Sequence, residues 1–261
     1  MTCWRFIETG PCDGPTNMAV DEALLACFNP LTDRPVLRIY GWTPPALSHG
    51  RFQRAAEVLD LSRCAARNVP VVRRISGGGV IFHADEITYS LVCAPRHIPP
   101  APSISESFRV LTAFLLRFYG KLGLDARYAV DCAPRGTVLG ERTPFCFAGK
   151  ERYDILIGGR KIGGNAQRRL KNVIFQHGSV PLVNRAVEGA GFLATPPAMD
   201  GTTTAALGDF GVKLAPEELN GLLLDSFAGS LGIAWDASSL APEENAAVER
   251  FLADGKERAI P

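Results

Sequence analysis

A run of three glycines is the feature that most constrains how this chain folds. Residues 77–79 are all glycine, and they lie between two apolar runs, residues 69–72 and 87–92, that have the composition of β-strands. Because glycine has no side chain, the backbone here can take positive φ angles or approach a ligand closely. The side chains that flank the turn are cationic or can carry a proton: Arg73, Arg74 and His83. The pattern fits a tight structural turn, and it also fits a turn that holds an anionic ligand through backbone N–H groups.

Hydrophobic periodicity predicts strands and helices on both sides of this turn. The expected strands are residues 4–9, 36–40, 46–52, 69–74, 86–93, 126–130, 153–157, 160–165 and 173–182. The expected helices are residues 17–28, 55–68, 105–122, 216–232 and 242–258. A Gly-Gly pair at residues 158–159 predicts a hairpin, and strands and helices do not alternate regularly. We therefore predict an α/β (α+β) fold with a mixed, mostly antiparallel sheet and packed helices.

Two local signals refine these helices. Ser103 and Glu106 form the pattern of a capping box, which predicts the start of the helix at residues 105–122. Asp21 and Glu22 lie in the early turns of the helix at residues 17–28, where the helix dipole favours anions. We expect both carboxylates to be solvated.

Composition excludes several classes of protein. The chain has 261 residues, which fits one large domain or one domain with a small appendage. Apolar residues make up 46% and charged residues 21%, so a core is available and there is no signature of disorder. A net charge of +1 gives no electrostatic reason to expect nucleic acid. No apolar run is long enough to span a membrane and the N-terminus lacks a signal-peptide pattern, so we expect a cytoplasmic protein without nucleic-acid or membrane partners.

The seven cysteines do not form a recognisable framework. Their number is odd and no C-x-x-C occurs, which argues against disulfides and against a zinc ribbon. Four dispersed histidines do not suggest a metal site, and we expect none. Most of the cysteines should be small buried side chains, and one is available as a nucleophile. They are Cys3, Cys12, Cys27, Cys64, Cys93, Cys132 and Cys146.

Glycine is dense at several predicted strand ends. The segments concerned are residues 73–83, residues 159–167 and residues 177–179, together with the short connector at residues 145–147. Small residues at strand ends leave room for a ligand against bare backbone.

Taken in order, these motifs resemble the lipoate/biotin protein ligase and octanoyltransferase superfamily. They are Arg73-Arg74-x-Ser76-Gly77-Gly78-Gly79-x-x-x-His83, Thr88-Tyr89-Ser90, Gly159-Arg160-Lys161-Ile162-x-Gly164-x-Ala166-Gln167 and Gln176-His177-Gly178-Ser179. The resemblance covers residues 4–182, with a weaker likeness to about residue 233. It implies a mixed sheet like that of the biotin ligase catalytic domain and a medium-chain acyl group bound beside the glycine turn. We expect residues 1–190 to form the acyltransferase or ligase catalytic domain, and residues 191–261 to form a C-terminal loop and helices packed on it.

The resemblance leaves more than one chemistry open. Lipoate ligases of this superfamily activate a free acid with ATP, use the lysine that corresponds to Lys161 and need no cysteine. Cysteine-type octanoyltransferases take octanoyl from acyl carrier protein onto the cysteine of a Cys-Phe pair. They then pass it to a lysine of a lipoyl domain or of glycine-cleavage H protein. This chain has Cys146-Phe147 fifteen positions before Lys161, as that branch does.

Two alternatives remain at this stage. The turn from Ser76 to Gly79 looks more like the ligase form, so an ATP- and Mg²⁺-dependent lipoate ligase stays possible. Amidotransfer of octanoyl from one lipoyl-type protein to another would use the same cysteine. For the acyltransferase, which we favour, we expect no cofactor. Its donor would be octanoyl-acyl carrier protein, and its acceptor a lipoyl domain or H protein.

Elementary chemistry supports pairing a cysteine with a lysine. A free thiol with a pKa of about 8.5 is mostly protonated at neutral pH, and a neighbouring ammonium stabilises the thiolate. We predict Cys146 and Lys161 as catalytic residues, with Cys132 as a rival nucleophile that lacks the Cys-Phe context. The predicted substrate-binding residues are Arg73, Arg74, Ser76, Gly77, Gly78, Gly79, His83, Gly163, Gly164, Asn165, Ala166, His177 and Gly178.

Overall fold

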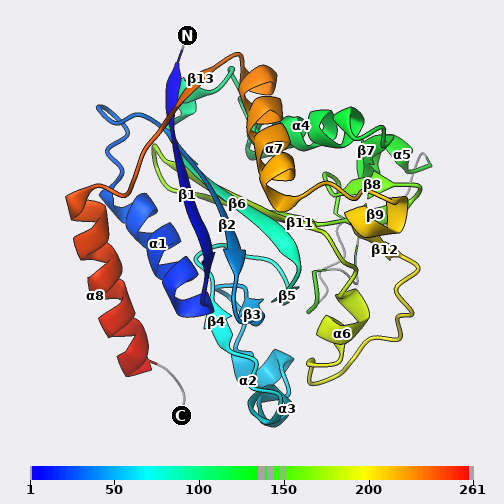
Figure 1. The fold of residues 1–261 in the computed structure, drawn as a ribbon. Helices are drawn as coiled ribbons and strands as arrows, with labels where there is room; N and C mark the ends of the chain where they lie inside the picture. The colour runs from blue at the N-terminus through cyan, green and yellow to red at the C-terminus, as the bar shows by residue number, and fades with distance from the viewer. Residues whose placement is uncertain (1, 135–138, 140–143, 147–148, 150, 259–261) are drawn as a thin grey trace.

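A mixed six-stranded sheet forms the centre of the computed structural model, which describes residues 2–134, 139, 144–146, 149 and 151–258 (Figure 1). The strand order is β10-β11-β6-β2-β1-β13. The pairs β2–β6, β6–β11 and β10–β11 are antiparallel, and β1 runs parallel to β2 and to β13. This is the mixed, mostly antiparallel sheet predicted from the sequence. Its strands are β1 (Cys3–Cys12), β2 (Val36–Trp42), β6 (Glu86–Cys93), β10 (Gly164–Arg169), β11 (Ile174–Pro181) and β13 (Ala234–Ala237).

Helices cover both faces of this sheet. Helices α1 (Gly14–Cys27) and α8 (Pro242–Arg258) lie on one face, and α4 (Ile104–Lys121) and α7 (Pro216–Leu231) lie on the other (Figure 1). The predicted capping box starts α4, because the Ser103 hydroxyl accepts from the N–H of Glu106. The core beneath α4 and α7 is aromatic. The rings of Trp4 and Phe114 pack edge-on against Phe227, with centroids 4.9 and 5.2 Å away, and this joins the first strand to the C-terminal part of the chain.

Two small sheets carry the segments that the motifs singled out. One has the order β4-β3-β5 and flanks the glycine turn, and the other has the order β12-β9-β8-β7 and carries Lys161. The first contains β3 (Ala46–His49), β4 (Val71–Arg73) and β5 (Ile81–His83). The second contains β7 (Ala126–Tyr128), β8 (Ile155–Ile157), β9 (Arg160–Ile162) and β12 (Thr204–Ala205). The remaining elements are short: α2 (Ala55–Val58), α3 (Leu61–Ala66), η1 (Pro95–His97), α5 (Ala129–Cys132), α6 (Ala186–Ala190) and η2 (Leu207–Phe210).

Three predicted elements were wrong in extent. The single helix expected at residues 55–68 is two short helices, because the Asp60 side chain accepts from the N–H of Arg63 and starts a second helix there. The return strand expected at residues 160–165 breaks at Gly163, whose φ is +71°. A Cβ at that position would collide with the carbonyl of Ser179. The chain therefore leaves the small sheet at the end of β9 and enters the central sheet as β10. In the third case, the strand expected at 126–130 ends at Tyr128, where α5 begins.

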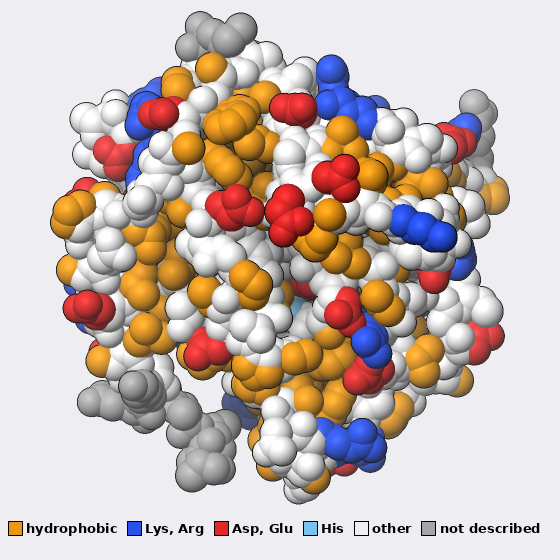
Figure 2. All heavy atoms as spheres, viewed as in Figure 1, with side chains coloured by type: hydrophobic (Ala, Val, Ile, Leu, Met, Phe, Trp, Pro, Cys, Tyr) orange, Lys and Arg blue, Asp and Glu red, His pale blue; other side chains and the backbone are white. Residues whose placement is uncertain are grey.

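The face drawn in Figure 2 carries charged side chains of both signs. They are distributed over that face without a continuous region of one sign. Within the described ranges, none of the helices combines the length and the apolar character needed to cross a membrane.

Candidate active site

The segment that carries Cys146 lies directly against the glycine turn. The N–H of Val80 donates to the carbonyl of Pro144 at 2.8 Å, and the N–H of Cys146 donates to the carbonyl of Val80 at 3.0 Å. A Cβ at Gly79 would lie 2.8 Å from the nitrogen of Cys146, so only glycine allows this approach. The turn therefore fixes the position of the thiol. The second residue of the Cys-Phe pair, Phe147, lies outside the described residues.

Lys161 brings a buried ammonium to the same thiol. Its Nζ lies 3.8 Å from Sγ of Cys146 and donates to the carbonyl of Cys146 at 2.6 Å. The same atom lies 2.7 Å from Oδ2 of Asp154, and Lys161 is only 2% exposed. Burial lowers the pKa of Lys161, but the negative charges of Cys146 and Asp154 raise it, and the pKa is raised overall. Lys161 is therefore an ammonium at neutral pH, held beside the sulfur of Cys146.

Asp154 is a site residue that the sequence did not reveal. It is 8% exposed, and its carboxylate pairs with Lys161 and accepts from the N–H of Glu151 at 2.7 Å. In the β8–β9 pair, Leu156 lies opposite Lys161. Because side chains alternate along a strand, a residue two positions before Leu156 shares its face. The position of Asp154, two residues before the hairpin partner of Lys161, was therefore the sequence signal that could have identified it.

Gly164, at the start of β10, forms the wall behind the thiol. A Cβ at this position would lie 2.9 Å from Sγ of Cys146, and its next neighbour would be the side chain of Ile81 at 3.9 Å. The thiol thus lies between the glycine turn, the ammonium of Lys161 and a bare stretch of β10 backbone.

Replacing Gly164 by alanine is expected to displace the thiol rather than the backbone. Sγ ends a rotatable side chain, so it can move away from the new methyl group and out of contact with Lys161. We expect alkylation of this thiol to slow by about 10- to 100-fold, the range typical of a small misplacement of a reacting group. The measurement is the rate of alkylation of Cys146 by iodoacetamide. Gly120→Ala is the matched control, because Gly120 is helical with no atom within 4 Å of its Cβ position. Equal alkylation rates in both variants would contradict this account.

Arg74 holds the glycine turn in shape. Its guanidinium donates to the carbonyls of Gly77 at 2.8 Å and Gly79 at 2.6 Å, and to the carbonyl of Ser48 at 3.1 Å. Burial lowers the pKa of Arg74 to about 10, and its side chain remains a cation at neutral pH. The structure therefore gives Arg74 a positioning contact with the turn. Arg73, at the end of β4, is exposed instead.

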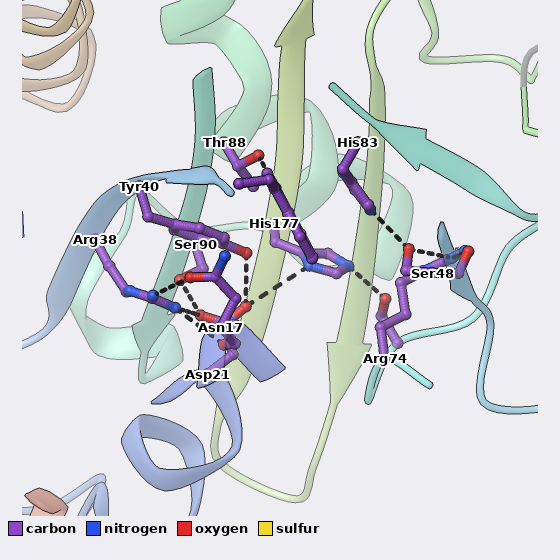
Figure 3. Close-up of polar contacts among 12 residues, drawn as sticks. Asn17, Asp21, Arg38, Tyr40, Ser48, Arg74, His83, Thr88, Ser90 and His177 are labelled. Carbon is purple, nitrogen blue, oxygen red and sulfur yellow. Dashed lines mark hydrogen bonds and ion pairs between the residues drawn. The ribbon is translucent and has the colours of Figure 1, made fainter. Parts of the chain in front are cut away.

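His83 lies behind Arg74 in a second buried network. Its Nε2 shares a hydrogen bond of 2.8 Å with the hydroxyl of Ser48, which also lies 3.2 Å from the guanidinium of Arg74. Its Nδ1 contacts the carboxylate of Glu86 at 2.7 Å, and its ring stacks on Trp42 with centroids 3.9 Å apart. His83 therefore supports Arg74 through Ser48, as Figure 3 shows.

His177 connects the turn to a buried carboxylate. Its Nε2 shares a hydrogen bond of 2.5 Å with the hydroxyl of Ser76, and its Nδ1 lies 3.9 Å from Asp21 (Figure 3). Asp21 is 1% exposed, so the solvated carboxylate expected from the sequence was wrong. It pairs with Arg38 at 2.8 Å, and the hydroxyl of Tyr40 donates to it at 2.9 Å. The buried cation supplied by β2 explains why this helix carboxylate faces inward.

The pH dependence of the stability of the chain should depend on the protonation of His177. Burial lowers the pKa of His177 well below its ordinary value, and the charges of Arg74 and His83 act in the same direction. The folded chain therefore keeps His177 neutral. Its stability is complete above the unfolded pKa of about 6.5 and declines as pH falls below it, by up to about 1.4 kcal/mol per pH unit.

His177→Gln should remove that part of the pH dependence. We expect urea unfolding between pH 7.5 and 5.5 to show a smaller loss of unfolding free energy in the variant than in the wild-type chain. The comparison of slopes cancels the contributions of other titrating groups, which both proteins share. Identical slopes would mean that His177 titrates alike in the folded and unfolded chain, which would contradict the lowered pKa.

The paired strands β10 and β11 lie beside this network and carry Asn165, Ala166 and Gly178. Ala166 lies opposite His177 in the β10–β11 register, and Asn165 lies opposite Gly178. The hydroxyl of Tyr89 donates to the side-chain carbonyl of Asn165 at 2.8 Å. A Cβ at Gly178 would collide with that carbonyl, so this glycine allows the asparagine to lie across β11. The structure thus brings the predicted residues of both glycine-rich strands to one region, next to Ser76.

The rival nucleophile lies apart from this arrangement. Cys132 is exposed at the end of α5, whereas Cys146 is half-buried beside Lys161. Burial raises the pKa of Cys93 to about 12, so that thiol stays protonated. In the part of the chain that the structure describes, no group of three or more His, Cys, Asp and Glu side chains could hold a metal ion.

Comparison with known sequences gives consistent matches. Residues 13–198 match the model of the lipoyl protein ligase A/B catalytic domain. The octanoyltransferase LipM of Kyrpidia tusciae is 34% identical over 263 residues, covering 97% of this chain and 96% of that protein. The LipM octanoyltransferases of an Exiguobacterium species and of Bacillus subtilis are 40% and 36% identical. Those two matches cover 69% of this chain and 66% and 65% of the relatives, so they span about two thirds of each relative.

Comparison with solved structures shows the fold. The crystal structure of a lipoate-protein ligase A bound with ATP has a TM-score of 0.79 at 24% identity, covering 97% of this chain and 95% of that one. A putative lipoate protein ligase from Thermoplasma acidophilum with bound lipoic acid has a TM-score of 0.78 at 23% identity, covering 97% and 96%. At this level of identity the likeness establishes the architecture of the chain.

Proposed function

We propose that this chain, which belongs to the lipoyl protein ligase A/B catalytic domain family, is an octanoyltransferase of lipoate biosynthesis with Cys146 as its nucleophile. The octanoyltransferase relatives, one of them matched over nearly its whole length, support the activity. The observation that carries the mechanism is the buried ammonium of Lys161, 3.8 Å from Sγ of Cys146.

The first half-reaction moves the acyl group onto the cysteine. The thiolate of Cys146 attacks the carbonyl of the octanoyl thioester on the donor, octanoyl-acyl carrier protein. The tetrahedral intermediate collapses, the bond to the donor sulfur breaks, and Lys161 gives its proton to the departing thiolate. The products are an octanoyl thioester on Cys146, a neutral Lys161 and a free thiol on the carrier.

Acylation itself helps Lys161 to give up its proton. Negative charge on Cys146 is one of three charges, with those of Asp154 and Glu151, that raise the pKa of Lys161 against the effect of burial. A thioester carries no charge, so that contribution disappears when the acyl group arrives. Asp154 stays paired with Lys161 and keeps the side chain in place for the second step.

The second half-reaction passes the acyl group to a lysine. The neutral amine of the acceptor, a lipoyl domain or glycine-cleavage H protein, attacks the thioester on Cys146. Lys161 takes the proton that the nitrogen loses as the amide forms, and Cys146 leaves as a thiolate. The original ion pair is restored. A thioester is already an activated acyl group, so the sequence of steps needs no ATP.

The residues around the thiol would then shape the acyl site. Ser76, Gly77, Gly78 and Gly79 with Arg74 would form the turn against which the acyl group binds. Gly163, Gly164, Asn165 and Ala166 would line its other side. His177 and Gly178 would hold that backbone in place, and His83 would support the turn through Ser48 and Arg74. A second donor, a lipoyl-type protein that carries octanoyl, would use the same cysteine. The contact between Lys161 and the thiol of Cys146 supports transfer through the cysteine rather than an ATP-dependent ligase.

The test is whether the chain takes the acyl group without ATP. Purified protein is mixed with octanoyl-acyl carrier protein, and the intact mass is measured before and after hydroxylamine treatment. We expect an octanoyl adduct that hydroxylamine removes, as a thioester requires. Absence of an adduct, with transfer to a lipoyl domain only when ATP and free octanoate are supplied, would overturn the proposal in favour of the ligase.

A further inference from the structure

The loop at residues 50–54, between β3 and α2, bridges the two halves of the proposed active site. The N–H of Arg51 donates to the carbonyl of Ser76 in the glycine turn at 2.9 Å. The side-chain amide of Gln53 donates to the carbonyl of Pro144, two positions before Cys146, at 3.0 Å. The same side chain accepts from the N–H of Gly50 at 2.9 Å, which closes the loop on itself. Whatever the loop presents outward is therefore held at a fixed place relative to the thiol.

The loop presents a phenylalanine to solvent. Phe52 is 83% exposed, and the guanidinium of Arg51 lies over its ring, 4.9 Å from the centroid. The ring approaches Gly77, where a Cβ would lie 3.8 Å from it. An exposed hydrophobic residue alone needs no explanation. An aromatic ring with an arginine on an anchored loop at the rim of a reactive thiol has the composition of an interface anchor.

Arg51 and two arginines on segments next to the glycine turn form no ion pair within the described residues. Arg73 is exposed at the end of β4, opposite His49 in the β3–β4 register. Arg168 on β10 lies against the carbonyl of Ile75, 3.5 Å from its Nη1. Neither residue, nor Arg51, forms an ion pair within the described residues, whereas nearby Arg54 is paired with its neighbour Glu57.

Two of these arginines, Arg51 and Arg168, are close enough for the charge of one to act on the other. Burial lowers the pKa of Arg168, and the charge of Arg51 lowers it further, while Glu22 on α1 acts in the opposite direction. Arg51 and Arg168 together carry more positive charge than Glu22 offsets, and a net positive surface favours an anionic partner.

We propose that Phe52, Arg51, Arg73 and Arg168, together the arginine patch, are the docking surface for the acidic carrier protein that delivers the octanoyl thioester. This inference rests on the proposed function. A carrier presents its acyl group on a flexible arm joined through a phosphodiester, and arginine pairs well with phosphate and carboxylate oxygens. The patch lies at the rim of the glycine turn, so a docked carrier would place its arm beside Cys146.

A second surface, next to Lys161, carries the opposite charge, which is why we assign the arginine patch to the donor. Two carboxylates, Asp154 and Glu151, line a hollow of about 340 Å³ whose remaining walls are Ile104, Ser105, Phe108 and Tyr153. The acceptor brings a lysine, and carboxylates favour an approaching ammonium whereas arginines oppose it. The donor protein would thus bind at the arginines, and the acceptor protein would approach at the carboxylates.

The test separates docking from chemistry. Phe52→Ser and Arg51→Glu are assayed for acylation of Cys146 by octanoyl-acyl carrier protein and by the small thioester octanoyl-N-acetylcysteamine, which has neither phosphate nor a protein surface. The expected result is a rise in KM for the carrier of at least about tenfold, equivalent to one strong interface contact. The rate with the small thioester should change by less than about twofold. Raising the salt concentration should weaken carrier binding in the wild-type chain more than in Arg51→Glu.

Leu31→Ser and Arg67→Glu are the matched controls, because Leu31 is 78% exposed and Arg67 is exposed, and both lie outside the patch. An unchanged KM for the carrier in both patch variants would overturn the proposal. Equal losses with both donors would also overturn it, since the loop would then support only the thiol. A raised KM for the lipoyl domain alone would assign the surface to the acceptor. A wild-type chain that neither donor acylates would instead refute the proposed function, and the variants would not differ from it.

Discussion

Replacing Cys146 by alanine is expected to abolish octanoyl transfer while leaving the chain folded. The side chain is half-buried and its loss removes a single sulfur, so the free energy of unfolding should change by less than about 1 kcal/mol. Transfer depends on a covalent thioester, and loss of a nucleophile costs at least about 10³-fold in rate. Intact mass after mixing with octanoyl-acyl carrier protein measures the first step, and octanoylation of a lipoyl domain measures both.

Cys132→Ala is the control for this prediction. Cys132 is exposed at the end of α5, without an ammonium beside it in the described structure, so its removal should leave transfer at the wild-type rate. ATP-independent transfer by Cys146→Ala at more than about a tenth of the wild-type rate would contradict the mechanism, because no covalent route through Cys146 would remain. Loss of activity in Cys132→Ala alone would move the nucleophile to α5.

The main parts of the candidate site could be proposed from the sequence because each is a local motif. The glycine turn, Cys146 and Lys161 stand in order in the sequence, and glycines at strand ends predict close backbone approach. Asp154 and Asp21 were missed for one physical reason. A carboxylate is buried only where the fold supplies a cation, and those cations, Lys161 and Arg38, come from other strands.

The errors in the fold have a similar origin. Apolar spacing at residues 55–68 fits one continuous helix, and only the capping contact of Asp60 with Arg63 shows that the chain starts a second one. The spacing at 160–165 predicts a strand correctly, but it does not say that Gly163 divides it between two sheets. Short elements such as β13 and α6 carry too few residues to show a period. Long elements with caps, such as α4, were predicted to within one residue at either end.

Replacing Lys161 by methionine is expected to cost both activity and stability, for different reasons. Removal of the ammonium leaves the carboxylate of Asp154 buried without its partner, and breaking a buried ion pair destabilises a protein by about 3–5 kcal/mol. Removal of the proton donor and acceptor should slow each half-reaction by about 10²- to 10⁴-fold. Urea unfolding measures the first effect, and the acylation rate from octanoyl-acyl carrier protein measures the second.

The double variant Lys161→Met, Asp154→Asn separates the two effects. Without the unpaired carboxylate, much of the lost stability should return, while the acylation rate should stay low because Lys161 is still absent.

The pH dependence of stability provides a further check. The raised pKa of Lys161 contributes stability that is fully present below the unfolded pKa of about 10.4 and is lost as pH rises through the folded value. Between pH 9 and 11 the wild-type chain should therefore lose more stability than the double variant. Recovery of wild-type acylation in the double variant would show that Lys161 only supports the fold and moves no proton.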